Sequence, residues 1–165
     1  DTLSFVMEDM VRNIALGSEI HCQASLGNFQ GETYKNVTLQ TFTDDGNCDG
    51  VFAVSFVPFD TTDPTVRTSY YLVDPSGAGG PSPRRLYKST DSGTNFSPIT
   101  PAEIKIDPFK SGFKVTGAEL ALPGGTGDTV QPKVTIRLAG TMVFKDTTSP
   151  FDLQTTVSQR LIDGE

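Results

Sequence analysis

The sequence predicts an α+β fold in which one N-terminal amphipathic helix packs on an antiparallel β-sheet. Two observations carry this prediction. Apolar residues recur at helical spacing near the start of the chain, and beyond them short apolar stretches alternate with turns rich in glycine and proline. Strands and helices do not alternate along the chain, so a parallel sheet is not expected. The 165 residues suffice for one hydrophobic core, and we expect a single domain over 1–165, with 1–17 helical and 18–165 β-rich.

One face of the predicted helix, residues 1–17, is apolar. Its members recur every three or four residues and are Leu3, Val6, Met7, Met10, Val11 and Ile14. Glu8 and Arg12 are spaced four residues apart with the acid first, the favourable order for an ion pair on a helix, and Gly17 suits the position after a helix C-terminus. No capping residue precedes the pattern, so we expect this helix to be the second part of a longer one. A frayed natural terminus is the alternative.

Strands are expected after the helix wherever residues alternate with period two or form short apolar runs. They cover residues 36–42, 51–59, 69–73, 86–89, 103–106, 113–122, 133–139 and 151–159. In 133–139, apolar residues alternate with lysine, threonine and arginine, which predicts one buried and one exposed face. The glycine- and proline-rich segment 74–83 is expected to be a surface loop rather than a domain linker.

The charge balance and the motifs argue against two classes of function. The chain carries 20 acidic and 13 basic residues, a net charge of −7, and no block of lysine or arginine. Direct nucleic-acid binding is therefore not predicted from the chain as a whole. His21 is the only histidine, and the sequence contains neither a Gly-x-Ser-x-Gly nucleophile motif nor a phosphate-binding loop. We therefore expect a protein that is not an enzyme.

The two cysteines, Cys22 and Cys48, predict a disulfide bond. A bridge between them would close a long loop and stabilise the fold by roughly 3 kcal/mol. Two unpaired buried thiols are the alternative. The composition favours the bridge, because few lysines, many serines and threonines and frequent turns are typical of exported β-rich domains, in which disulfides persist.

The segment 45–50, Asp-Gly-Asn-Cys-Asp-Gly, matches the first half of a calcium-binding loop. Asp45, Asn47 and Asp49 would supply oxygen ligands at alternate positions, and glycine would allow the sharp turn. The twelfth position is Phe56 rather than glutamate, so the loop is not an EF-hand. A calcium site is one interpretation, and a turn rich in Asx and glycine between two strands is the other. No other cofactor is expected.

Three parts of the chain resemble type IV pilin-like proteins. The helix Leu3–Ile14 resembles the second half of the long N-terminal pilin helix, and the segments 131–140 and 151–160 resemble the closing strands of many bacterial prepilin-like proteins. The strings Tyr70–Val73 and Leu86–Lys88 resemble a strand pair common in that family. The order of these strings, rather than any one of them, carries the resemblance, and the remaining middle of the chain shows no match.

The resemblance covers residues 1–23 and about 130–160, and it implies a fold, a function and partners. The fold would be a pilin-like head, a β-sheet carried by the exposed half of the helix. The function would be that of a structural subunit of a bacterial type IV pilus, a pilin or minor pilin that assembles into a surface fibre for motility, adhesion or DNA uptake. The full-length precursor would be anchored in the cytoplasmic membrane, and its partners would be other pilin subunits. The assembly face of the helix would comprise Leu3, Val6, Met7, Met10 and Ile14.

Two other functions fit the same sequence. One is a pseudopilin of a type II secretion system, which a calcium-dependent head would favour. The other is a free secreted β-domain that binds a ligand or a carbohydrate. The family often pins a loop of the head with a disulfide. Here the predicted bridge would tie the end of the helix to the first strands rather than to the C-terminal region, which leaves the branch of the family open.

Overall fold

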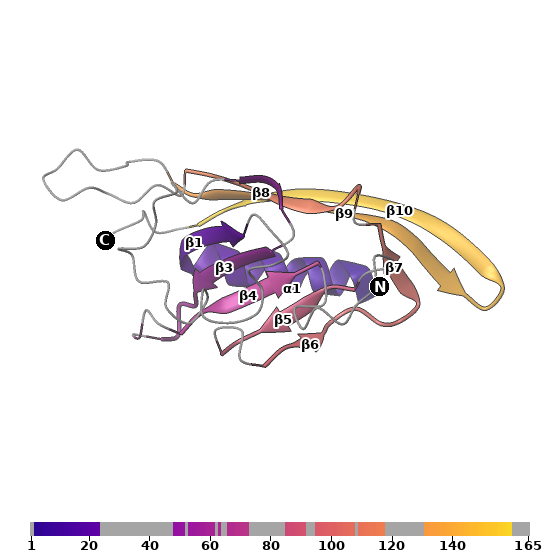
Figure 1. The fold of residues 1–165 in the computed structure, drawn as a ribbon, viewed down its shortest axis with the longest axis horizontal. Helices are drawn as coiled ribbons and strands as arrows, with labels where there is room; N and C mark the ends of the chain where they lie inside the picture. The colour runs from indigo at the N-terminus through magenta and orange to yellow at the C-terminus, as the bar shows by residue number, and fades with distance from the viewer. Residues whose placement is uncertain are drawn as a thin grey trace, which may run out of the picture.

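The computed structural model describes residues 2–23, 48–51, 53–61, 63, 66–72, 85–91, 95–107, 109–117 and 131–159. Within these ranges the chain forms one helix and ten strands (Figure 1). In chain order the elements are α1 (Thr2–Leu16), β1 (Ser18–Gln23), β2 (Cys48–Val51), β3 (Ala53–Val57), β4 (Thr68–Tyr71), β5 (Tyr87–Ser89), β6 (Ser97–Pro98), β7 (Ile104–Ile106), β8 (Gly112–Thr116), β9 (Lys133–Phe144) and β10 (Thr147–Ser158).

The strands form two antiparallel sheets. The strand order is β1-β3-β4-β5-β6 in one sheet and β10-β9-β8-β2 in the other, where β7 also pairs with β9. The second sheet contains the two longest strands, β9 and β10, which pair without interruption from Lys133 opposite Ser158 to Phe144 opposite Thr147. Figure 1 shows this sheet along one side of the molecule, with α1 running beside the first sheet.

The predicted fold class is wrong. The sequence led us to expect an α+β fold, a pilin-like head with its helix packed on one antiparallel sheet, but the described chain forms two antiparallel sheets and one 15-residue helix. The fold therefore belongs to a β-rich class. The error arises because a period-two pattern shows which face of a strand is buried but not which strands become neighbours. For example, β2 pairs with the distant β8 and not with β3, which follows it directly.

Several individual elements were predicted correctly. The helix expected over 1–17 is present as α1. Four expected strands, 69–73, 86–89, 103–106 and 113–122, correspond to β4, β5, β7 and β8. β8 ends at Thr116, and residues 73 and 118–122 of these predictions lie outside the described residues. Each of these segments has a strong local pattern, which is sufficient to identify an element without knowledge of its partners.

Other elements differ from their predictions. The strands expected at 133–139 and 151–159 are longer than predicted, because they continue into one hairpin, β9–β10. The apolar run 51–59 is divided between the two sheets, as the last residue of β2 and as β3. The strand expected at 36–42 and the loop expected at 74–83 lie outside the described residues.

The apolar face of α1 is buried in the core. Its four fully buried residues are Leu3, Val6, Met10 and Ile14. They belong to one cluster of buried side chains that includes Val54 and Phe56 from the first sheet and Ile136 and Leu138 from the second. Complete burial of one such side chain contributes about 1.5–3 kcal/mol, so this face fixes the helix to both sheets.

A buried glutamine joins three elements. Gln159 follows β10, and its Nε2 donates to the carbonyl of Ile14 in the last turn of α1, at 3.3 Å. Its Oε1 accepts from the N–H of Ile20 in β1, also at 3.3 Å. The Ile14 carbonyl also accepts from the N–H of Gly17 at 3.2 Å. The side chain of Gln159 adds a second donor at this helix end, where carbonyls lack the usual partners within the helix.

A polar network ties α1 to the first sheet. The hydroxyl of Tyr70 in β4 donates to Oδ2 of Asp9 at 2.9 Å and accepts from Nδ2 of Asn13 at 2.9 Å. Lys88 of β5 places its Nζ 3.0 Å from the same Asp9 oxygen. Burial raises the pKa of the Tyr70 hydroxyl well above its ordinary value. The network therefore requires a neutral phenol.

Stability should fall at alkaline pH, and Tyr70→Phe should reduce this loss. An unfolded tyrosine loses its proton near pH 10, and the pKa of Tyr70 in the folded protein is higher. The contribution of the neutral phenol is therefore complete below about pH 10 and is lost as the pH rises further. We expect Tyr70→Phe to cost about 1–2 kcal/mol at about pH 8, and this deficit to shrink by roughly 1 kcal/mol at about pH 10.5. Urea unfolding at both pH values measures the difference, and a constant deficit would contradict the prediction.

Candidate functional site

The side chains of the predicted disulfide and calcium site lie outside what the structure describes. In the backbone, Cys22 belongs to β1, and Cys48 and Asp49 belong to β2. Asp45 and Asn47 precede β2, outside the described residues. β1 and β2 belong to different sheets and contact each other, so a bridge between the two cysteines would join the sheets. Both the disulfide and the calcium site stay predictions.

Among the described residues, no three His, Cys, Asp or Glu side chains are grouped so that they could hold a metal ion. No helix of this part of the chain has the length and hydropathy needed to cross a membrane.

The apolar residues predicted to form the assembly face of α1 point into the protein itself. As described above, four of them are buried in the core, and Met7 packs against the same cluster. The opposite side of the helix carries Phe5, whose side chain is 71% exposed, together with the exposed Glu8 and Arg12. A role of α1 in assembly stays a prediction, and Phe5 is the large apolar residue that the helix leaves accessible for it.

The β9–β10 hairpin continues beyond the other strands as an arm (Figure 1). We define the arm as residues 144–150, all of which are exposed. At its tip Lys145 has a positive φ of 54°, and its Nζ lies 5.7 Å from the centre of the Phe144 ring. Phe144 is nevertheless 72% exposed. The N-terminus of α1 lies towards the same end of the molecule as the arm (Figure 1).

β9 changes its partner along its length. Residues 133–137 pair with β8, whereas residues 140–142 pair with β7. Between these segments the carbonyl of Ala139 accepts from the N–H of Asp107 at 2.8 Å, and the N–H of Ala139 donates to Oγ of Ser111 at 2.9 Å. Asp107 and Ser111, from the segment between β7 and β8, thus supply the hydrogen bonds that no strand partner provides at Ala139. These bonds fix that segment against β9.

Gly140 permits the close approach of the backbones of β7 and β9 where the two strands pair. A Cβ atom built at Gly140 would lie 2.0 Å from the backbone oxygen of Lys105 and 3.0 Å from the Cα of Ile106. These atoms belong to the backbone and cannot rotate away, so this position of the strand admits no side chain.

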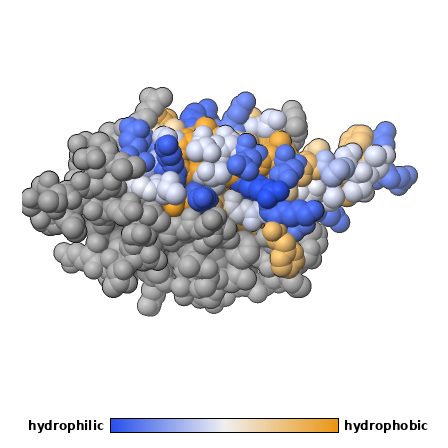
Figure 2. All heavy atoms as spheres, turned by 90° about the horizontal axis from the view of Figure 1, so that it is seen from above, coloured by the Kyte–Doolittle hydropathy of each residue, from blue (hydrophilic) through white to orange (hydrophobic). Residues whose placement is uncertain are grey.

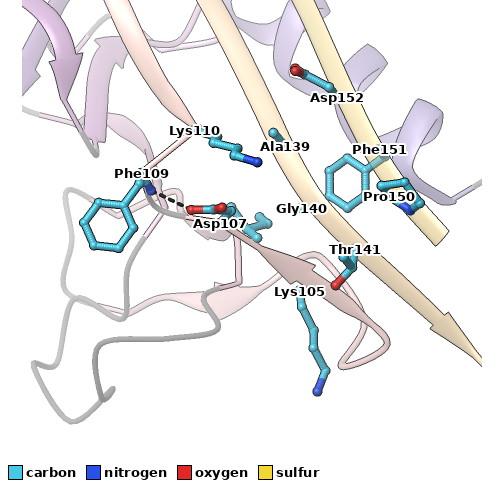
Figure 3. A pocket seen from close by; sticks show the side chains of 11 residues that line it. Lys105, Asp107, Phe109, Lys110, Ala139, Gly140, Thr141, Pro150, Phe151 and Asp152 are labelled. Carbon is cyan, nitrogen blue, oxygen red and sulfur yellow. Dashed lines mark hydrogen bonds between the residues drawn. The ribbon is translucent and has the colours of Figure 1, made fainter. Parts of the chain in front are cut away.

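Beside the paired segment of β7 and β9 lies a groove of about 540 Å³ (Figure 3). β7, the following loop, β9 and β10 form its walls. The polar side chains of its lining are those of Lys105, Asp107, Lys110, Thr141 and Asp152, and the large apolar ones are those of Ile106, Phe109, Pro150 and Phe151. In Figure 3 the Lys110 side chain points towards β9, whereas the Lys105 side chain extends away from it. The groove therefore combines cationic, carboxylate, hydroxyl and aromatic groups.

The exposed side of the β10-β9-β8 sheet brings together cations that are scattered in the sequence. Lys114 of β8 lies opposite Thr135 of β9, which lies opposite Thr156 of β10. The two threonine hydroxyls are 3.1 Å apart, so these side chains share one face. Figure 2 looks onto this side and shows hydrophilic groups gathered across the strands. We call its basic side chains the cationic face; they are Lys105, Lys110, Lys114, Lys133 and Arg137, all exposed.

An ion pair lies within the cationic face. Arg137 donates two hydrogen bonds to Asp152, from Nε to Oδ1 at 3.2 Å and from Nη2 to Oδ2 at 2.8 Å. These bonds hold the pKa of the Asp152 carboxyl below its ordinary value, and the positive charge of Lys110 acts in the same direction. Asp152 is therefore ionised at neutral pH and orients Arg137 on the sheet.

Neither the cationic face nor the groove was predicted from the sequence. The alternation in 133–139 correctly placed Lys133 and Arg137 on an exposed face, and this was the only available signal. Lys105 and Lys114 join them through strand pairing over long distances along the chain, which no local pattern reveals.

No known protein family, characterised protein or solved structure matches this chain. The resemblance to pilin-like proteins therefore rests on the sequence strings alone. What the protein does has to be argued from the surfaces that its fold presents.

Proposed function

We propose that the protein is a structural subunit of a bacterial surface fibre of the type IV pilus class, a pilin or minor pilin. The proposal is supported chiefly by two exposed aromatic residues towards one end of the molecule, Phe5 on α1 and Phe144 on the arm. Aromatic side chains held on rigid elements are typical contact residues of protein interfaces. The proposal concerns assembly and does not include the pilin head fold, which the two-sheet architecture replaces.

Both elements that carry these residues are firmly anchored. The buried face of α1, the Asp9–Tyr70 hydrogen bond and Gln159 fix the helix to both sheets. The arm continues two 12-residue strands that pair without a break. Phe5 and Phe144 thus lie on elements with regular hydrogen-bonded backbones, and a repeating contact between subunits needs such a defined geometry.

The mechanism in this proposal is polymerisation. The partners are other pilin subunits, and the assembled protein is extracellular, on the bacterial surface. The full-length precursor would be held in the cytoplasmic membrane until assembly. Motility, adhesion or DNA uptake would then be properties of the fibre, with the β-rich body on its surface.

We expect Phe5→Ala and Phe144→Ala each to lower the amount of protein in sheared surface fibres by about tenfold, because an aromatic contact at the centre of an interface contributes about 1–2 kcal/mol or more. Phe59→Ala is the matched control. Phe59 is 69% exposed but lies after β3, on neither α1 nor the arm. Immunoblots of sheared and whole-cell fractions, from cells that produce the full-length protein, measure incorporation.

Thermal unfolding should be nearly the same for all three variants, since each replaced side chain is exposed. If the unmutated protein does not occur in sheared fibres, the proposal is wrong. If Phe59→Ala reduces incorporation as much as the other two variants do, the contact is not made by α1 and the arm.

A further inference from the structure

The cationic face is an ordered stripe. Its strand residues occupy alternate positions on the exposed side of the sheet, so successive rows are roughly 6.8 Å apart along a strand. From Lys133 at one end to Thr141, which lies opposite Lys105, the stripe is roughly 27 Å long. Six of the neutral side chains on the same rows carry hydroxyl or amide groups: Thr116, Thr135, Thr141, Gln154, Thr156 and Ser158. Gly112, Ala139 and Pro150 occupy the other neutral positions.

We propose that the cationic face binds a linear acidic polysaccharide, a uronic-acid polymer whose chain runs along β9. Its carboxylates would contact the lysines and Arg137, and its hydroxyl groups would hydrogen-bond with the threonines and Gln154. Because the protein carries a net charge of −7, it binds a polyanion only where cations are concentrated locally. This site is separate from Phe5 and Phe144, so the proposal does not depend on fibre assembly.

The groove extends the stripe at one end. Lys105 and Lys110 belong to both, and Thr141 and Asp152 line the groove floor next to them. A volume of about 540 Å³ lies within the range of small-molecule binding sites and can hold a sugar unit. The groove could thus hold one sugar unit of a polymer whose other units lie on the open face of the sheet.

A nucleic acid fits the face less well. Duplex DNA carries about one negative charge per 1.7 Å, a density far above that of cationic rows roughly 6.8 Å apart, and the acidic remainder of the protein would repel it. Single strands are usually held by aromatic side chains on which the bases stack. The described rows of the stripe carry none, and the exposed Phe109 lies in the adjacent loop.

An anionic bilayer also fits less well. Proteins that lie on a bilayer insert apolar side chains between the headgroups, beside their cations. The described rows of the cationic face carry mostly threonine, serine and glutamine between the charged residues, and these groups gain nothing from insertion. The exposed apolar groups, Phe109 and Pro150, lie at the groove end alone. A hydrated polymer with regularly spaced carboxylates satisfies both the charges and the hydroxyl groups.

The test is the binding of fluorescently labelled polygalacturonate to the chain, followed by fluorescence polarisation. We expect Lys114→Gln/Lys133→Gln to weaken binding at least about tenfold, since two charge contacts are lost. The matched control, Arg12→Gln/Lys145→Gln, removes the same charge from α1 and the arm and should bind as the unmutated protein does. Thr135→Val/Thr156→Val keeps every charge and the β-branched shape, and should weaken polygalacturonate binding about threefold.

Circular dichroism and melting temperature confirm that each variant is folded. The proposal is overturned if the unmutated protein does not bind polygalacturonate, or if the control variant loses as much affinity as Lys114→Gln/Lys133→Gln. It is also overturned if duplex DNA, or vesicles of phosphatidylglycerol, bind more tightly than polygalacturonate at the same salt concentration. An unchanged affinity of the threonine variant would show that charge alone holds the polymer and would overturn the assignment to a polysaccharide.

Discussion

Gly140→Ala is expected to lower the free energy of unfolding by about 3 kcal/mol, near the upper end of the usual cost of an oversized side chain. The new Cβ would lie 2.0 Å from the backbone oxygen of Lys105, and neither atom belongs to a flexible side chain. The conflict can be relieved only if β7 moves away from β9. The three ladder pairs between these strands, and the groove beside them, would be lost with that movement.

Urea unfolding measures the loss of stability, and amide hydrogen exchange locates it. Exchange should accelerate in β7, while the first part of β9, which pairs with β8, should keep its protection. Thr141→Val is the control, because it alters the next residue of the same strand but keeps a β-branched side chain, and it should cost less than about 0.5 kcal/mol. A Gly140→Ala protein as stable as the control would show that the backbones of β7 and β9 do not approach this closely in solution.

Arg67→Ala is expected to cost about 4 kcal/mol, the largest effect of a side-chain deletion that we predict. Arg67 is only 1% exposed, and its guanidinium binds one residue of the neighbouring strand twice. Its Nε donates to the Ser55 hydroxyl at 2.8 Å and its Nη2 to the Ser55 carbonyl at 2.9 Å. The deletion leaves both a cavity and polar atoms of Ser55 without these donors, and both effects destabilise.

A double-mutant cycle separates the two effects. Ser55→Ala alone should cost about 1–2 kcal/mol, and the double variant should cost about 1 kcal/mol less than the sum of the two single changes, because the partners interact directly. Arg12→Ala, which removes an exposed arginine from α1, should stay within about 0.5 kcal/mol of the unmutated protein. Additive effects of the two changes would contradict the role of Ser55 as the partner of Arg67.

The parts of the fold that were predictable from the sequence are those encoded locally. Leu3, Val6, Met10 and Ile14 recur every three or four residues, and all four are buried on one face of α1. The alternation of 133–139 placed Val134 and Ile136 inside, where the structure has them. In each case the period of the pattern equals the period of the element.

What could not be predicted depends on contacts between distant residues. β1 has no clear alternation and exists through its pairing with β3, and β6 consists of two residues held by β5. A buried arginine such as Arg67 contradicts the usual preference of this residue for the surface. Its burial depends on Ser55, a partner in another strand that local pattern cannot identify.

The candidate sites also divide into those that the sequence indicates and those that depend on strand pairing. The cysteines and the calcium-like segment were visible as residue types, yet their geometry depends on side chains outside the described ranges. The cationic face was invisible, because Lys105 and Lys133 are far apart in the chain and meet on one side of the sheet only through the pairing of β7, β8 and β9. The groove likewise needs Gly140. Its lack of a side chain matters only because β7 pairs with β9 at this residue.

The order of strands in the two sheets has a consequence for how copies of this protein meet. In the described topology the ends of the strand order are β1 and β6 in one sheet and β2 and β10 in the other, where the three-residue β7 forms a further short edge beside β9. β1 and β2 each contain a bulge that shifts their register, and β6 and β10 each contain a proline, Pro98 or Pro150, which has no N–H to donate. These bulges and prolines interrupt the row of hydrogen-bonding groups that each of the four strands could offer to a foreign strand. Strand addition between copies is therefore disfavoured at these positions, and with it the amyloid-like aggregation to which a β-rich protein is exposed at high local concentration.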